Sequence, residues 1–392
     1  MTDTPHSSRP FLWADPAWRA VVAAFAFNGL FFGTWAARIP AFKDKFDLDP
    51  QTLGLLLLGL AAGAIVSFPV AGTLSERLGA ARLTVLCAWA YGPVFVALAF
   101  APSPIWLAFA LLAFGAVHGG MDVVMNAWGA KVETDMGRST MSIFHALFSV
   151  GAGLGAASGY VAARLGMDPT AHFLIVAGAG ALVSLPLMIP VARNTLPDPQ
   201  AGGTPMLALP SRSLILVGLI AFTSSMGEGA MADWSAVFLL TVAEATEAEA
   251  ALCYTVFSVA MVVVRLMGGV VIARLGPVFA CRASAATAFL GLMISIFGGS
   301  QALIYMGFAL VGMGYAVIMP LAFSRAANDP KIRPGPALAG VATLGYGGLL
   351  LGPPIIGFLA QAVGIRLSFL ALAALTLLAM VLASQLRMKA KA

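Results

Sequence analysis

The sequence predicts an all-α integral membrane protein of twelve transmembrane helices, arranged as two pseudo-symmetric bundles of six. Three observations support this fold class: an apolar composition, twelve long apolar runs, and motifs that recur at one fixed offset. Of the 392 residues, 60% are hydrophobic and 10% are charged. A soluble domain carries about a quarter charged residues, so this chain needs lipid around it.

The apolar runs give the predicted spans, because a bilayer-crossing helix needs about 20 mostly apolar residues. They lie near residues 17–39, 51–74, 83–101, 104–130, 139–163, 170–192, 213–241, 250–273, 278–299, 301–326, 335–362 and 367–386. A Pro- and Gly-rich stretch separates the sixth run from the seventh. The predicted organisation is therefore an N-terminal bundle over 1–192, a cytoplasmic linker over 193–212 and a C-terminal bundle over 213–392.

The basic residues predict how the chain is oriented. Twelve spans put both termini on one side. Of the 22 basic residues, four (Lys43, Lys45, Arg164 and Arg366) lie in segments on the other side, two lie inside spans, and the remaining sixteen lie on the side of the termini. Positive charge accumulates on the cytoplasmic side, so we expect a multi-pass protein of the bacterial inner membrane with both termini cytoplasmic. The polar N-terminus has no small-residue cleavage site, which favours a retained first helix over a signal peptide.

The two halves share an internal repeat. Residues 72–79 (GTLSERLG) follow the second span, and residues 269–276 (GVVIARLG) follow the eighth, at an offset of 197. The same offset places Gly151 and Gly155 on Gly348 and Gly352. Two separate matches at one offset indicate a parallel repeat, and glycines at these spacings predict close helix packing.

The segment 72–79, with Arg82 after it, resembles the loop signature of the major facilitator superfamily, and the resemblance extends over essentially the whole chain. It implies that family's fold and a cytoplasmic gating latch formed by Glu76, Arg77 and Arg82. Glu76 replaces the usual Asp, and Ala273 removes the acid from the second copy. The alternative is a topology anchor that does not switch.

Three further segments resemble the MosC-like branch, which lies near the fucose permeases: 121–126 (MDVVMN), 142–148 (SIFHALF) and 228–235 (EGAMADWS). The acid-x3-Asn pattern of Asp122 and Asn126 is similar to the one that fucose permeases use for proton coupling and sugar contact. The first span departs from that pattern, since it has no carboxylate.

Ionisable residues inside the spans are candidates for chemistry, because a charge at bilayer depth costs at least about 2.5–3.5 kcal/mol and so faces a partner or a watery cavity. His118, Asp122 and Asn126 recur every four residues on one helix face. Asp122 is the first candidate for a proton-coupling site. Its alternative is a static partner for a buried cation, His118 or Arg38.

Glu228 and His145 are the other predicted proton-coupling residues. Glu228 alternatively makes a packing hydrogen bond, and His145 alternatively packs without relaying protons, although its ordinary pKa of about 6.5 suits a relay. Arg265 either pairs with an acid or extends toward the cytoplasmic end of its helix, and we expect the latter.

Amide, aromatic and charged side chains of the spans are predicted to contact a polar, ring-shaped solute. The aromatic members are alternatively interfacial anchors, and Asp233 is alternatively a solvated residue at the outer mouth. The predicted substrate-binding residues are Asn28, Trp35, Arg38, Asn126, Asp233, Trp234 and Tyr346.

These features predict a monomeric secondary active transporter that moves a small polar, sugar-like solute by alternating access, as a proton-coupled symporter. The alternative is proton-coupled efflux of amphipathic compounds. No Walker loop, H-E-x-x-H or G-x-S-x-G motif is present, so we expect neither an ATP-driven pump nor an enzyme. The third class considered is a non-transporting receptor or sensor, which a soluble signalling domain would support. We expect no cofactor, metal or nucleic acid, and the partners are solute, protons and lipid.

Overall fold

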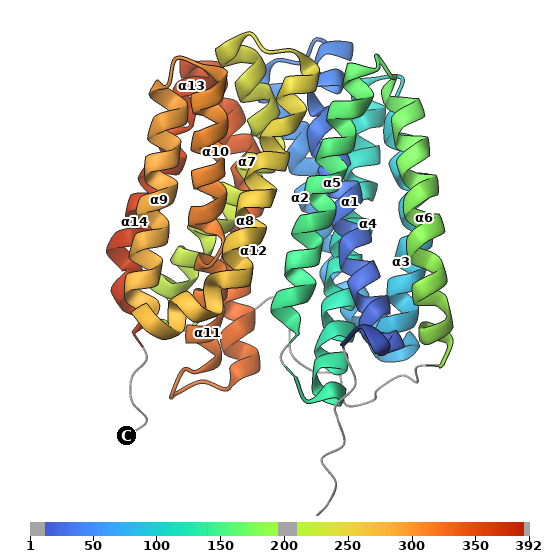
Figure 1. Cartoon of the computed structure of the whole chain (residues 1–392), viewed down its shortest axis with the longest axis vertical. Coiled ribbons are helices and arrows are strands. Elements are labelled where there is room, and N and C mark those ends of the chain that lie inside the picture. The colour runs from blue at the N-terminus through green and yellow to red at the C-terminus, as the bar shows by residue number, and fades with distance from the viewer. Residues whose placement is uncertain (1–11, 139, 195–209, 388–392) are drawn as a thin grey trace, which may run out of the picture.

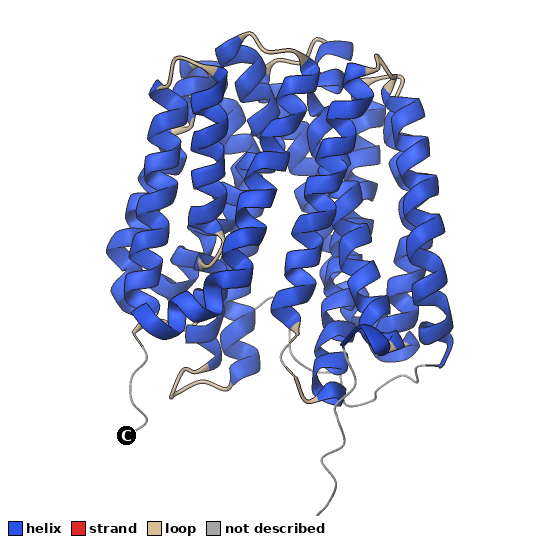
Figure 2. Cartoon of the chain, in the orientation of Figure 1, coloured by secondary structure: helices blue, strands red, loops and turns tan. Residues whose placement is uncertain are grey.

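The computed structural model describes residues 12–138, 140–194 and 210–387, and every regular element in these ranges is a helix (Figure 2). Twelve helical segments are long and apolar enough to cross a membrane, which confirms the predicted fold class. The tenth segment is formed by α10 and α11, and the twelfth by α13, α14 and η2. The elements are η1 (Leu12–Ala14), α1 (Pro16–Lys45), α2 (Pro50–Leu78), α3 (Ala80–Ala99), α4 (Pro104–Met136), α5 (Met141–Arg164), α6 (Pro169–Asn194), α7 (Ile215–Ala243), α8 (Glu247–Leu275), α9 (Pro277–Phe297), α10 (Gln301–Tyr315), α11 (Ile318–Ala327), α12 (Pro334–Val363), α13 (Ile365–Ser368), α14 (Leu370–Leu382) and η2 (Ala383–Leu386).

Capping side chains set where several spans begin. The carboxylates of Asp15 and Asp49 accept hydrogen bonds from the first N–H groups of α1 and α2, and Ser103 and Ser300 do the same for α4 and α10. Thr246 begins α8 with a reciprocal capping box. These side chains satisfy N–H groups that have no partner inside the helix.

The two copies of the loop motif end their helices in the same way, as the internal repeat predicts. Gly79 after α2 and Gly276 after α8 have φ values of 86° and 76°, and each donates its N–H to the carbonyl four residues earlier. Only glycine adopts this backbone conformation without strain, which explains why the glycine stands in both copies.

Helices α1–α6 and α7–α14 form two neighbouring bundles (Figure 1). Glycine brings helices of each bundle into backbone contact, as predicted. A Cβ placed on Gly155 of α5 would lie 2.1 Å from the Leu30 carbonyl oxygen of α1. One on Gly348 of α12 would lie 2.4 Å from the Phe222 carbonyl oxygen of α7. The boundary at 193–212 stays a prediction, since residues 195–209 lie outside the described ranges.

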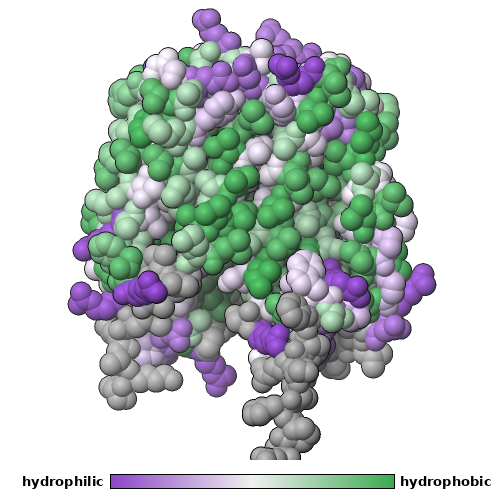
Figure 3. Space-filling model, viewed as in Figure 1, coloured by the Kyte–Doolittle hydropathy of each residue, from purple (hydrophilic) through white to green (hydrophobic). Residues whose placement is uncertain are grey.

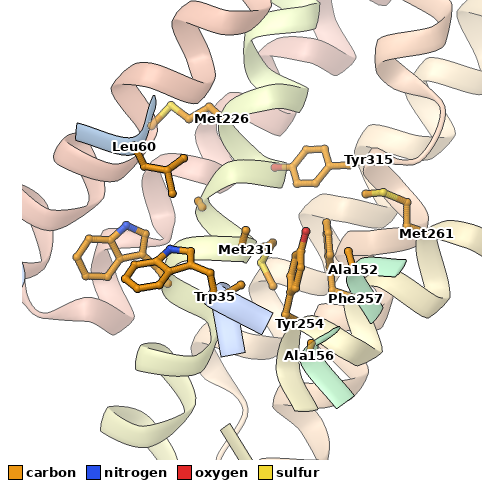
Figure 4. Packing of buried hydrophobic residues seen from close by; sticks show 14 of the residues in the cluster. Trp35, Leu60, Ala152, Ala156, Met226, Met231, Tyr254, Phe257, Met261 and Tyr315 are labelled. Carbon is orange, nitrogen blue, oxygen red and sulfur yellow. The ribbon is translucent and has the colours of Figure 1, made fainter. Parts of the chain in front are cut away.

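The bundles meet toward the end of the molecule at which α1 finishes and α2 begins, which we name the distal end. There α12 reaches α2, with a Cβ on Gly357 2.6 Å from the Pro50 carbonyl oxygen. Ala152 and Ala156 of α5 face the rings of α8 (Figure 4). At the opposite end, where α1 begins and η2 finishes, the surface is notched between the bundles (Figure 3). We name this the terminal end.

Apolar side chains cover the outside of both bundles at mid-height, and polar ones gather at the two ends (Figure 3). Large hydrophobic residues such as Ile105 and Leu182 are more than 70% exposed. Such a belt is the surface that lipid requires.

Candidate functional site

A polar stripe on α4 faces the interior of the molecule. Phe109 of this helix is 69% exposed and points outward. His118 lies nine residues further on, which is two and a half helical turns, so it is on the opposite face. His118, Asp122 and Asn126 are nevertheless only half-buried. Interior side chains that remain accessible indicate an internal space between the bundles.

Asp122 forms no ion pair with any described residue. Its carboxylate accepts a hydrogen bond from the Asn126 amide at 3.2 Å, and its backbone carbonyl accepts another from the same amide at 2.8 Å. Neither His118 nor Arg38, the two cations considered as static partners, binds it. Asp122 is therefore a carboxylate inside the membrane-spanning region without a compensating positive charge.

His118 and Asn28 belong to a network inside the first bundle. The Tyr91 hydroxyl, on α3, lies 2.6 Å from His118 Nδ1 and 2.7 Å from Asn28 Oδ1. The Asn28 amide nitrogen faces Met125 Sδ at 3.6 Å, and Asn28 is fully buried. Asn28 was predicted to bind substrate, but the structure places it behind Tyr91 in the core of the bundle.

A second polar centre joins the bundles. Arg265 of α8 lies 3.1 Å from the Glu228 carboxylate of α7 and donates to the Ser149 hydroxyl of α5 at 2.8 Å. The Ser224 hydroxyl donates to the other Glu228 oxygen at 3.3 Å. The expectation that Arg265 extends toward the helix end was wrong, because an acid lies within reach and an unpaired charge in the span is costly.

Arg265 also contacts the interruption in the tenth span. Helix α10 ends at Tyr315 and α11 begins at Ile318, and Arg265 Nε lies 3.4 Å from the Ala316 carbonyl oxygen between them. A break in a spanning helix frees backbone groups that must find other partners. The guanidinium supplies one such partner, so the charge centre and the interruption form one structural unit.

The side chains of His145 and Asp233 make no hydrogen bond or ion pair with the described members of these centres, although the His145 carbonyl oxygen accepts a hydrogen bond from the Ser149 hydroxyl at 3.3 Å. His145 stands in the second turn of α5 rather than at mid-span, with an exposed side chain edge-on to Phe25. Asp233 lies in the distal half of α7, is 8% exposed, and has no ion pair among the described residues. The structure thus brings Glu228 and Arg265 together and connects the His145 backbone to them through Ser149, whereas Asp233 has no such connection among the described residues.

The remaining predicted substrate residues divide between the distal end and the bundle interface. Trp35 and Trp234 are buried, and neither indole N–H has a hydrogen-bond partner in the described structure. Arg38 donates to the Met167 carbonyl oxygen at 2.8 Å and lies 3.4 Å from the Glu247 carboxylate across the interface. Tyr346 of α12 packs on Phe68 of α2 with ring centroids 4.5 Å apart.

The predicted latch is largely open in this structure. Glu76 and Arg77 are exposed and make no hydrogen bond or ion pair with a described residue. Arg82 donates to the Arg193 carbonyl oxygen near the end of α6 at 3.3 Å. The loop lies at the terminal end, where the bundles are apart.

Sequence reasoning missed Ser149 and Tyr91, which hold Arg265 and His118 in place. A serine and a tyrosine in an apolar helix carry no motif, and only the approach of three helices identifies them. No described residues form a cluster of three or more His, Cys, Asp or Glu side chains that fits a metal ion.

Comparison with known proteins agrees with this architecture. A family model described as Major Facilitator Superfamily matches residues 20–342. An uncharacterized transporter of Sinorhizobium fredii, y4wD, is 43% identical over 371 residues, which cover 94% of this chain and 98% of that protein. The membrane protein MosC of Rhizobium meliloti is 32% identical over 356 residues, or 88% of this chain and 84% of MosC.

Among solved structures, that of the nucleoside transporter NupG superposes with a TM-score of 0.73 at 14% identity and covers 96% of this chain and 100% of its own. At this identity the likeness concerns the fold alone.

Proposed function

The chain belongs to the major facilitator superfamily of membrane transporters, in its MosC-like branch, and we propose that it is a proton-coupled symporter of a small polar, sugar-like solute. The observation that carries the proposal is Asp122: a half-buried carboxylate on the interior face of α4 that forms no ion pair with any described residue. As a multi-pass transporter it takes its solute from one side of the bilayer to the other without ATP.

Asp122 is the proposed proton-coupling site because its charge is poorly compensated. An ionised carboxylate away from bulk water is costly unless it is paired, and among the described side chains only the Asn126 amide donates to Asp122. Proton uptake removes this cost. We propose that Asp122 is protonated in one state of the cycle and releases its proton in another, where water reaches it.

Glu228 is the second proposed coupling group, through its pairing with Arg265. In this arrangement the guanidinium compensates Glu228 and also binds Ser149 of the other bundle. A proton on Glu228 would weaken the ion pair and leave Arg265 free to contact an anionic or hydroxyl group of the solute. His145 is proposed to relay protons from the terminal end, where its side chain is exposed.

The way in which the bundles meet supports alternating access as the proposed mechanism. They touch at the distal end and are apart at the terminal end. With the termini in the cytoplasm, as the basic residues predict, this state opens inward. Closing the terminal end would bring the latch of Glu76 and Arg77 against helix ends of the other bundle.

The solute class is inferred from the interior surface. Asp122, Asn126, Tyr346 and His118 are half-buried and supply carboxylate, amide, hydroxyl and imidazole groups. The His118 ring stacks on Phe32, whose ring centroid lies 6.4 Å from that of Phe148. A ring-shaped solute with several hydroxyl groups matches such a mixture. We propose that the protein acts as a monomer in the bacterial inner membrane.

Purified protein in proteoliposomes tests the proposal. An inward proton gradient should drive accumulation of a labelled sugar or polyol selected by a thermal-shift screen, since a ligand of the folded state raises its apparent stability. Asp122→Asn should abolish accumulation while solute exchange continues. Asp135→Asn is the matched control, because Asp135 lies on the same helix in an exposed pair with Lys131.

Two results would count against the proposal. Full gradient-driven accumulation by Asp122→Asn would exclude Asp122 as the coupling acid. Net export of amphipathic compounds against their gradient, with no uptake of hydroxylated solutes, would establish the efflux alternative.

A further inference from the structure

We infer that His118 is a hydrogen-bond acceptor for the transported solute, with its proton held on Nδ1 and the lone pair of Nε2 turned to the internal space. The ligand class is a neutral solute that donates an O–H or N–H group. The identity of the ligand rests on the proposed function, whereas the tautomer of His118 follows from the hydrogen bonds of Tyr91 and Asn28 and does not depend on that function.

The network assigns the proton on the imidazole. The Tyr91 hydroxyl has one hydrogen and two close partners, Asn28 Oδ1 at 2.7 Å and His118 Nδ1 at 2.6 Å. Asn28 Oδ1 is an acceptor, so the hydroxyl hydrogen goes there. His118 Nδ1 must then carry its own hydrogen and donate it to the Tyr91 oxygen.

The orientation of Asn28 is the step on which this assignment depends. Its amide nitrogen faces Met125 Sδ at 3.6 Å, where an N–H group finds a weak acceptor. A reversed amide would put its oxygen against the sulfur with no donor. Asn28 is fully buried, so water cannot supply one, and a buried acceptor without a donor costs about 1–3 kcal/mol.

Nε2 is the free edge of the ring. It lies on the side of the imidazole away from Nδ1 and therefore away from Tyr91, which is wholly buried in the first bundle. Nε2 has no hydrogen bond with a described residue, and it is not fully buried. His118 is half-buried on the interior face of α4. The unprotonated nitrogen is thus open to the space between the bundles.

Rings around His118 limit what can approach Nε2. Phe32 of α1 stacks on the imidazole with centroids 4.9 Å apart, and Phe148 of α5 lies at 6.3 Å. Tyr254 of the second bundle lies 6.2 Å from Phe32. Asp122 is one helical turn away on the same face. The site combines apolar ring faces with two acceptors, and it has no cation among the described groups that contact it.

Nitrogen NMR measures the tautomer directly. Protein with 15N-labelled histidine, in lipid nanodiscs above the ordinary imidazole pKa of about 6.5, should show the His118 ring with a pyridine-type Nε2 and a protonated Nδ1. The chain has four histidines, and His118→Asn identifies the signal by removing it. Asn keeps an amide donor near Tyr91, so this variant preserves the network.

Tyr91→Phe removes the acceptor of the Nδ1 hydrogen and should abolish the preference for that tautomer. A wild-type His118 with its hydrogen on Nε2 would overturn the assignment.

The ligand class is tested on the same signal. A mixture of D-glucose, D-galactose and xylitol should shift the Nε2 resonance, and a mixture of tetramethylammonium and acetate, which donate no hydrogen bond, should not. No shift with the first mixture, or an equal shift with both, would overturn the ligand class. These measurements use no gradient, so they remain valid if Asp122 proves not to couple transport to protons.

Discussion

Replacing Glu247 with Gln removes one side of an ion pair that joins the bundles at the distal end. Arg38 of α1 and Glu247 of α8 lie 3.4 Å apart, and this contact exists only while the distal ends meet. Removing the charge should therefore destabilise the present state relative to one that opens at the distal end.

The size of the effect follows from the environment of the two groups. Unit charges about 4 Å apart attract by about 1 kcal/mol in bulk water and about 4 kcal/mol at an effective dielectric constant of 20. Arg38 is 2% exposed but Glu247 is 37% exposed, so solvent screens the pair and about 1–2 kcal/mol is expected. That energy corresponds to an increase of roughly 5- to 30-fold in the ratio of distal-open to distal-closed molecules.

Pulsed electron resonance between spin labels at residues 51 and 363 measures this ratio, because these positions begin α2 and end α12 at the distal end. Both sites are exposed. The half-buried Cys87 is first replaced by Ser so that it takes no label; Cys253 and Cys281 are buried. Glu247→Gln should increase the long-distance fraction.

Glu249→Gln is the matched control. Glu249 stands in the same first turn of α8, but its carboxylate binds Thr246 within the capping box and forms no ion pair with a described residue of the other bundle. If both variants change the distance distribution equally, the effect comes from charge at the helix terminus and not from the ion pair. If Glu247→Gln changes nothing, the pair does not hold the distal end closed.

Three further predictions concern stability, and thermal unfolding in detergent measures each. Gly155→Ala should cost about 1–3 kcal/mol because its Cβ would overlap the backbone of α1, whereas Gly178→Ala, with open space around it, should be neutral. Thr246→Ala should cost about 1 kcal/mol by removing the N-cap of α8. Backbone and side-chain hydrogen bonds from Thr52 lower the pKa of Asp49 below its usual 3.8, so their stabilisation is present above that value and is lost as the pH falls through the folded-state pKa. Asp49→Asn should flatten this acid-dependent loss, and an unchanged acid profile would contradict the assignment.

The number of spans could be predicted from sequence because lipid imposes a length and an apolar composition on each helix. The repeat could also be predicted, since a glycine with positive φ is required wherever the motif ends its helix, as at Gly79 and Gly276. The interruption between α10 and α11 was not predicted. Its residues are as apolar as their neighbours, and the one local signal is Pro320 in the first turn of α11, which has no N–H to donate to the Ala316 carbonyl.

The candidate site was predicted only in part. Asp122 and Glu228 are identifiable because an ionisable residue in a span needs an explanation, and Asn126 because it lies one helical turn after Asp122 on the same face. Their partners depend on which helices approach one another. Arg265 reaches Glu228, and Asn28 binds Tyr91, through side chains far apart in the sequence. The periodicity of one helix predicts which of its faces lies in the interior, but it does not predict which other helix packs against that face.

The glycine contacts have a mechanical consequence. Where the backbones of two helices touch, one helix cannot slide or tilt without moving the other. Helices α1 and α5 therefore move together as one rigid body, and α7 and α12 move together as another. Ser149 of α5 belongs to the first rigid body, and Glu228 of α7 belongs to the second. Arg265 of α8 belongs to the same bundle as Glu228, so it is the distance from Arg265 to Ser149 that varies with the angle between the bundles, and this hydrogen bond reports which state the transporter is in.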